Sequence, residues 1–168
     1  MKDEYVDIVD EDNEVLYKTT KEEAHKKGLL HRTVISEVID FKGRWLLFNP
    51  SDHKQDTGQY VSPIGGHVRS GETMEDALKR EAFEEAGLKD FKFKFVGRDI
   101  YNRFVIGRQE NHYFIVYEIY TDKKPVLSDE TKDFRYFSQK EIKDLMRTKP
   151  ETFGGAFHFV YKNIYNEF

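Results

Sequence analysis

Three glutamates in the middle of the chain have the spacing of a metal site. Glu81, Glu84 and Glu85 stand at the i, i+3 and i+4 positions of a helical repeat, which places three carboxylates on one side within about one turn. Like charges at this spacing repel, so a cation must offset them if they face the protein interior. Clustered hard oxygen ligands suit Mg²⁺ or Mn²⁺. A solvent-exposed acidic face is the alternative interpretation.

The neighbours of the three glutamates favour an inward orientation. At about 100° per residue, Met74, Ala77 and Leu78 fall on the same sector of the helix, so the stripe begins apolar and ends acidic. Arg80 lies four residues before Glu84 and could orient a carboxylate by a charge-assisted hydrogen bond.

A glycine-punctuated segment, residues 63–72, precedes this helix and is of the type that presents backbone groups to phosphate or metal. Together the segment and the helix give the spacing G-x5-E-x7-R-E-U-x-E-E-x-G-U, in which U is apolar. Its fixed positions are Gly66, Glu72, Arg80, Glu81, Ala82, Glu84, Glu85, Gly87 and Leu88. The pattern resembles the signature of the Nudix hydrolases, with Ala82 smaller than the usual aliphatic residue.

This resemblance implies an α/β protein with the Nudix fold, an α/β/α sandwich around a mixed sheet. It also implies Mg²⁺-dependent hydrolysis of a nucleoside diphosphate linked to a group X, the chemistry of a MutT-like pyrophosphatase. By motif position, Arg80 would orient the catalytic acids. The metal ligands would be Glu81, Glu84, Glu85 and the carbonyl oxygen of Gly65.

The general base is open, because members of the family use either a glutamate of the motif or one from a loop after the last central strands. Glu130 lies in such a loop, residues 127–131, and is the candidate outside the motif. An exposed loop acid with no role is the alternative.

The N-terminal segment resembles the start of isopentenyl diphosphate isomerase and its hydrolase relatives in the same superfamily, most clearly at residues 24–32. In those isomerases two histidines of this segment and a third beside the glycine-rich loop bind a metal. His25, His31 and His67 stand at similar places, with Glu110 as a carboxylate partner. Ordinary helix, strand and loop histidines are the alternative.

The isomerase chemistry needs a cysteine at the position of Gly65, and this chain contains no cysteine. The isomerases also usually carry a degraded form of the motif, whereas all its glutamates are present here. Hydrolysis is therefore favoured, with isomerisation as the second reading. Two other readings are a nucleotide-binding domain without activity, which usually lacks these glutamates, and an RNA pyrophosphohydrolase, which a basic stripe would support.

Composition indicates one folded domain with a small-molecule substrate. The 168 residues are 38% hydrophobic and 15% aromatic, and 27 basic against 31 acidic residues give a net charge of −4. No apolar run approaches the roughly 20 residues that cross a bilayer, so we expect a cytosolic protein without membrane or nucleic-acid polymer partners. The predicted parts are an extension over residues 1–30 and a core over residues 31–168.

Strands are predicted at residues 5–9, 14–18, 32–40, 44–48, 59–63, 91–101, 111–121 and 133–137. Helices are predicted from Thr20 to Gly28, from Thr73 to Ala86, from Ser138 to Met146 and near the C-terminus.

Candidates for substrate contacts lie outside the motif. Arg69, Arg103 and Tyr101 could bind a phosphate or stack on a base, although solvated arginines and core aromatics are the more common outcome. A homodimer is a further expectation. Its candidate surface comprises Phe153, Phe157, Phe159 and Tyr161.

Overall fold

The computed structural model describes residues 3–54, 56–105 and 107–165 and contains one eight-stranded mixed sheet. The strands are β1 (Tyr5–Val9), β2 (Val15–Thr20), β3 (His31–Ile39), β4 (Trp45–Pro50), β5 (Ile64–His67), β6 (Lys92–Val105), β7 (Arg108–Tyr120) and β8 (Thr131–Phe137). The helices are α1 (Lys21–Lys27), α2 (Met74–Ala86), α3 (Gln139–Thr148) and α4 (Gly155–Asn163), with a 3-10 turn at Pro150–Thr152.

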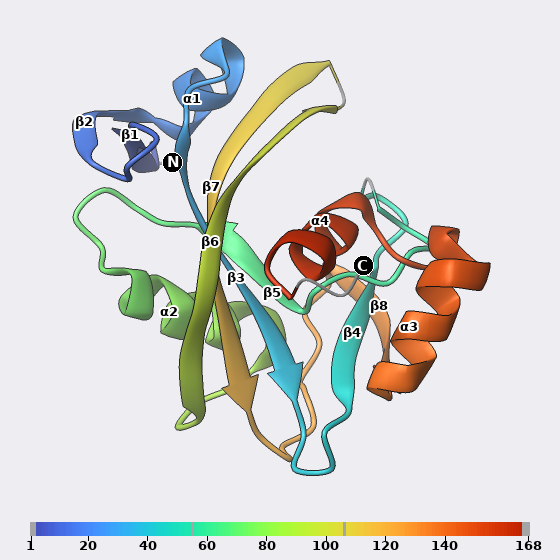
Figure 1. Cartoon of the computed structure of the whole chain (residues 1–168). Helices are drawn as coiled ribbons and strands as arrows, with labels where there is room; N and C mark the ends of the chain where they lie inside the picture. Colours follow the sequence, from blue (N-terminus) through green and yellow to red (C-terminus); the bar gives the residue numbers. More distant parts are fainter. Residues whose placement is uncertain (1–2, 55, 106, 166–168) are drawn as a thin grey trace.

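Strand β3 is the centre of the sheet (Figure 1). It runs parallel to β7 along its whole length, with His31 opposite His112 and Ile39 opposite Tyr120. On its other side β3 pairs with β5 over residues 33–36 and then with β4 at residues 38–39. The sheet therefore divides beside β3, and one strand contacts two different neighbours along its length.

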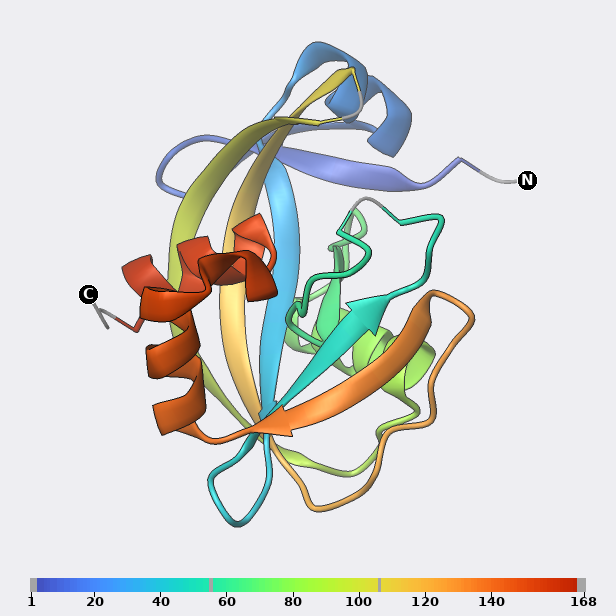
Figure 2. The ribbon, with the colours of Figure 1, turned by 90° about the vertical axis from the view of Figure 1, so that its right-hand side faces the viewer.

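Helices cover both faces of the sheet, as Figures 1 and 2 show: α2 lies on one face, and α3 and α4 lie on the other. The first core includes Val34, Leu46, Ile64 and Leu78, and the second is built around the fully buried Trp45. This arrangement confirms the predicted α/β/α sandwich. Within the described residues, no helix is both long and apolar enough to cross a membrane.

Local signals set the helix ends correctly. The Thr73 side chain accepts a hydrogen bond from the backbone N–H of Asp76, and α2 ends at Gly87, whose φ of 65° is the left-handed conformation that glycine adopts without strain. Helix α1 has the same pair of signals, with Thr20 before it and Gly28 after it. Ser138 and Glu141 form a complete capping box before α3.

Two sequence predictions are wrong. The strand expected at residues 59–63 contributes only isolated bridges at Tyr60 and Val61, and β5 begins at Ile64, directly after Pro63, which has no N–H for a ladder. The proposed dimer surface is also largely absent, because three of its four aromatic residues are core residues. Phe153, Phe157 and Tyr161 are at most 2% exposed and pack around Trp45.

Candidate active site

The glutamates of α2 take up three different environments. Glu81 belongs to the buried stripe of the helix with Leu78 and Ala82, and only 8% of the residue is exposed. Glu85 is partly buried, and the side chain of Glu84 is half exposed. The predicted inward orientation is thus correct for Glu81 and only partial for the other two.

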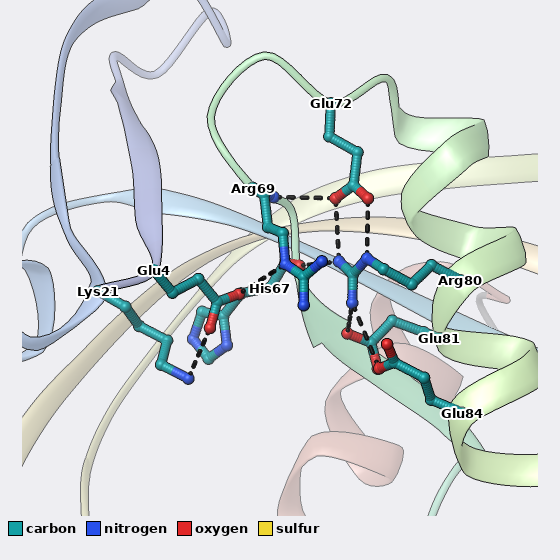
Figure 3. A network of polar contacts seen from close by, with 8 residues as sticks. All are labelled: Glu4, Lys21, His67, Arg69, Glu72, Arg80, Glu81 and Glu84. Carbon is teal, nitrogen blue, oxygen red and sulfur yellow. Dashed lines mark hydrogen bonds and ion pairs between the residues drawn. The ribbon is translucent and has the colours of Figure 1, made fainter. Parts of the chain in front are cut away.

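Arg80 connects the helix to the loop and to β5 (Figure 3). Its guanidinium donates two hydrogen bonds to the Glu72 carboxylate, at 2.8 and 2.9 Å, and one to Glu81 at 2.7 Å. It also donates to the backbone carbonyl oxygen of His67 at 3.0 Å and lies 3.5 Å from Glu84. The planar guanidinium thus holds the Glu81 carboxylate of α2 next to strand β5. A lysine, which has a single charged nitrogen, could not make this set of hydrogen bonds.

Strand β5 approaches α2 so closely that only glycine fits at position 66. A Cβ atom built on Gly66 would lie 2.2 Å from the carboxyl carbon of Glu81. Gly65 faces the same region and donates a backbone hydrogen bond to Glu85. Glycine at position 66 is therefore explained by the close approach of β5 to a carboxylate on α2.

The electrostatics of Glu81 and Glu85 suit a bound cation. Burial, with the negative charges of Glu81 and Glu130 as further causes, raises the pKa of Glu85 to about 10. Burial also raises the pKa of Glu81, which shares a hydrogen bond with Glu85. Two buried carboxyls that share a proton can bind a divalent ion in its place, because oxygen ligands of this kind are what Mg²⁺ and Mn²⁺ prefer.

These acids line a cavity of about 490 Å³ that also carries positive charge. Lys21, Lys54 and Arg69 line it together with the three α2 glutamates and Glu130. Lys21 pairs with Glu4 at 3.0 Å, and Arg69 lies 3.6 Å from the same carboxylate (Figure 3). A polar cavity lined by carboxylates and by four cationic side chains, Arg80 included, can hold a metal-bound phosphate group.

A second cavity of about 480 Å³ adjoins the first and shares Lys54, Gly65, Gly66, His67, Glu85 and Glu130 with it. Its other walls are more apolar. They include Ile35, Phe48, Val61, Ile64, Phe114 and Phe157. The two cavities together could bind a molecule with a charged end and a less polar end.

The structure brings some of the other predicted residues to these cavities. Glu130 lines both and pairs with Lys54 at 3.0 Å. Arg103 lines the second cavity, where it donates to Glu110 at 3.1 Å. Tyr101 is not among the residues that line either cavity; its ring stacks on Phe114 with 5.1 Å between ring centroids.

The three predicted histidines meet beside the first cavity, together with a fourth. His25 comes from α1, His31 from β3, His67 from β5 and His112 from β7, and one ring nitrogen of each lies within 4.8 Å of the others. Glu110 is outside this group, although its charge acts on His31. Alternation along a strand puts residues 110 and 112 on one face, but the sequence does not show that this face meets the other histidines.

The histidine cluster has the chemistry of a metal site. The Nδ1–H of His31 donates to the carbonyl oxygen of Leu29 at 2.8 Å, so its buried Nε2 carries a lone pair, and this atom has no hydrogen-bond partner among the described residues. The Nε2 atoms of His25 and His67 are 3.0 Å apart. Burial lowers the pKa of His31 and, together with the other histidines, lowers that of His67 well below its usual value. Neutral imidazoles are the form that binds metal.

Comparison with known proteins identifies the family. The NUDIX domain model matches residues 29–154. An isopentenyl-diphosphate Delta-isomerase 2 of Photorhabdus laumondii is 30% identical over 157 residues, which cover 90% of this chain and 86% of that protein. An uncharacterized Nudix hydrolase of Clostridium acetobutylicum is 29% identical over 133 residues, or 76% of this chain and 64% of that protein.

Solved structures show the same fold. The DR0079 protein of Deinococcus radiodurans superposes with a TM-score of 0.74 at 19% identity, covering 95% of this chain and 98% of that one. A MutT protein of Methanosarcina mazei gives a TM-score of 0.62 at 21% identity, covering 82% and 94%. The family match, the fold and the complete motif agree, and the chain belongs to the Nudix hydrolase family.

Proposed function

We propose that this chain is a Mg²⁺-dependent pyrophosphohydrolase, for which Mn²⁺ could substitute, that cleaves a phosphoanhydride bond in a nucleoside diphosphate linked to X or a related small nucleotide. One observation carries the proposal. The α2 glutamates and Glu130 converge on a cavity lined with cations, which opens into a second, less polar cavity. The first fits a diphosphate and the second fits the rest of the molecule.

Different side chains of the first cavity have different proposed roles. When bound, the metal would neutralise the negative charge of the diphosphate and lower the pKa of a water molecule, which makes that water a better nucleophile toward phosphorus. Glu81, Glu84, Glu85 and the carbonyl oxygen of Gly65 are the proposed ligands. Lys21, Lys54 and Arg69 are placed to bind phosphate oxygens.

Two further residues have proposed roles in the reaction. Arg80 holds Glu81 against β5, so this carboxylate need not reorganise during the reaction. Glu130, at the mouth of the cavity, is one candidate to take the proton of the attacking water, and a glutamate of the motif is the other.

A substrate panel tests the proposal directly. CTP, ADP-ribose, UDP-glucose, diadenosine tetraphosphate and isopentenyl diphosphate would be incubated with the protein and Mg²⁺, and products followed by phosphorus NMR. We expect cleavage of a phosphoanhydride bond in at least one nucleotide, and its loss when EDTA removes the metal. Tight nucleotide binding without cleavage in Mg²⁺ and in Mn²⁺ would instead identify a binding domain.

Isomerisation of isopentenyl diphosphate is a second candidate, supported by the relatives named as isomerases and by the histidine cluster. Glycine at position 65 and the absence of cysteine oppose it. The same panel separates the two reactions, because isomerisation would convert isopentenyl diphosphate to its allylic isomer without releasing phosphate. That product, formed in place of nucleotide hydrolysis, would overturn the hydrolase proposal.

We also propose that His25, His31, His67 and His112 bind a second metal ion, with Glu110 close by. Imidazole ligands favour Zn²⁺ and similar transition metals, whereas the carboxylates of α2 favour Mg²⁺ or Mn²⁺. The proposal is supported by the neutral, buried rings and by the lone pair of His31 Nε2.

Replacing His67 with glutamine should weaken Zn²⁺ binding at least about tenfold, because one ligand nitrogen is removed from a preformed site. Calorimetric titration of Zn²⁺ into EDTA-treated protein measures the effect. His158→Gln is the matched control, since His158 lies on α4, outside the cluster, and donates to the backbone carbonyl oxygen of Pro150. Equal Zn²⁺ affinity in His67→Gln and wild type would contradict a site at these four residues.

A further inference from the structure

Glu37 is a completely buried carboxyl group at the point where the sheet divides. It lies on β3 between Ser36, the last residue paired with β5, and Val38, the first paired with β4. Its exposed fraction is 0%. The proposed hydrolysis does not use this residue, and a buried acid needs a physical reason, because burying an unpaired charge is costly.

Among the residues that the structure describes, the contacts of Glu37 are few and include no positively charged group. Its Oε1 atom is hydrogen-bonded to the hydroxyl of Ser62, while Oε2 is buried and has no partner among the described residues. The titratable groups that face it are Glu118 on β7 and Tyr165 beyond α4. Both Tyr165 and Tyr120 donate to Glu118, at 2.7 and 2.5 Å.

The protonation of Glu37 follows from these contacts. Burial, with Glu118 as a further cause, raises the pKa of Glu37 to about 8, against the opposing effect of the Ser62 hydrogen bond, so the group is neutral at pH 7. A proton on Oε2 would be a buried donor without an acceptor. A proton on Oε1 is donated to Ser62 Oγ and leaves only a carbonyl oxygen unpaired, which is the less costly arrangement.

The proton on Glu37 Oε1 determines the hydrogen-bonding role of the Ser62 hydroxyl. A hydroxyl oxygen that accepts from Glu37 keeps its own hydrogen for another acceptor. Ser62 is partly exposed and lines the second cavity, between Val61 and Ile64. Its free hydrogen can therefore be directed into the cavity, at a wall that is otherwise mainly apolar.

We propose that Glu37, as a neutral acid, positions the Ser62 hydroxyl as a hydrogen-bond donor to an acceptor oxygen or nitrogen on the group X of the substrate. The inference rests on the proposed function, since it assigns the second cavity to that group. Ser62 contacts the substrate and selects for an acceptor, and Glu37 acts through Ser62 as a positioning residue.

Kinetics of four proteins test the inference, with the panel compound of highest kcat/KM as substrate. Wild type should keep a constant KM up to about pH 8, after which KM rises, because ionised Glu37 turns the Ser62 hydrogen back toward itself. Glu37→Gln, whose amide also donates to Ser62, should have wild-type KM at pH 7 and no rise above pH 8, whereas the control Glu75→Gln, which keeps Glu37, should show the same rise as wild type. Ser62→Ala should raise KM roughly five- to tenfold at pH 7, with kcat little changed.

An infrared titration checks Glu37 without turnover. In the difference spectrum between wild type and Glu37→Gln, the carbonyl band of a neutral buried acid should be present at pH 7 and disappear through about pH 8. An ionised Glu37 at pH 7, or identical pH profiles of KM in wild type and Glu37→Gln, overturns the inference even in an active hydrolase. If no panel compound is cleaved, the proposed function fails by itself, and the Kd of ADP-ribose measured by calorimetry replaces KM.

Discussion

Replacing Glu84 with glutamine is expected to lower kcat about a thousandfold while the protein stays folded. An amide is a neutral and weaker ligand, and a metal that activates water and neutralises charge contributes several kcal/mol to the barrier. The side chain of Glu84 is half exposed and makes only a 3.5 Å contact with Arg80, so its loss removes little packing. The measurement is kcat with saturating Mg²⁺, alongside the midpoint of thermal unfolding.

Glu75→Gln is the matched control, because Glu75 lies on the same helix, is exposed and lines neither cavity. It should retain wild-type kcat and stability. Near-normal turnover by Glu84→Gln, with Mg²⁺ at the same concentration, would remove Glu84 from the proposed metal ligands.

Replacing Glu37 with glutamine is expected to stabilise the protein, and the gain should grow with pH. The folded-state pKa of Glu37, about 8, lies above the ordinary value of 4.5. In the unfolded chain this group therefore loses its proton near pH 4.5, whereas in the folded protein it keeps the proton up to about pH 8. The free energy of unfolding of wild type falls as the pH rises between these two values and then stays constant. Glutamine does not titrate and keeps the shape of the neutral acid. The difference should reach on the order of 5 kcal/mol above pH 8.

Urea unfolding at pH 4.5, 7 and 8.5 measures this difference. The free energies of unfolding of the two proteins should be similar at pH 4.5 and diverge at higher pH, while Glu75→Gln follows wild type throughout. A constant difference across the three pH values would mean that Glu37 titrates alike in the folded and unfolded chain, contrary to its buried position.

Features set by neighbouring residues could be predicted from the sequence. Helix α2 was predictable because Thr73, the apolar stripe and Gly87 all act within one helix. The spacing of the motif also fixed which acids share a side of that helix. It could not fix their burial, which depends on how closely β5 approaches: the approach of Gly66 to Glu81 is a contact between two elements.

Features that depend on contacts between segments distant in the sequence could not be predicted, because the sequence does not show which segments meet. Lys21 and Lys54 join the first cavity from α1 and from the loop after β4, and nothing in their local sequence marks them. His112 meets His31 through the parallel register of β3 and β7, which only tertiary pairing defines. The strand predicted at residues 59–63 was wrong because the prediction used composition alone and considered no pairing partner. The observed strand β5 begins after Pro63, at Ile64.

Strand β5 contributes residues to both proposed ion sites. Within its four residues, Gly65 and Gly66 face the α2 acids and His67 belongs to the histidine cluster, while Arg80 binds both Glu81 and the His67 carbonyl oxygen. If loading one proposed site shifts this shared segment, the occupancies of the two sites are thermodynamically linked. The linkage is reciprocal: whatever factor Zn²⁺ imposes on Mg²⁺ affinity, Mg²⁺ imposes on Zn²⁺.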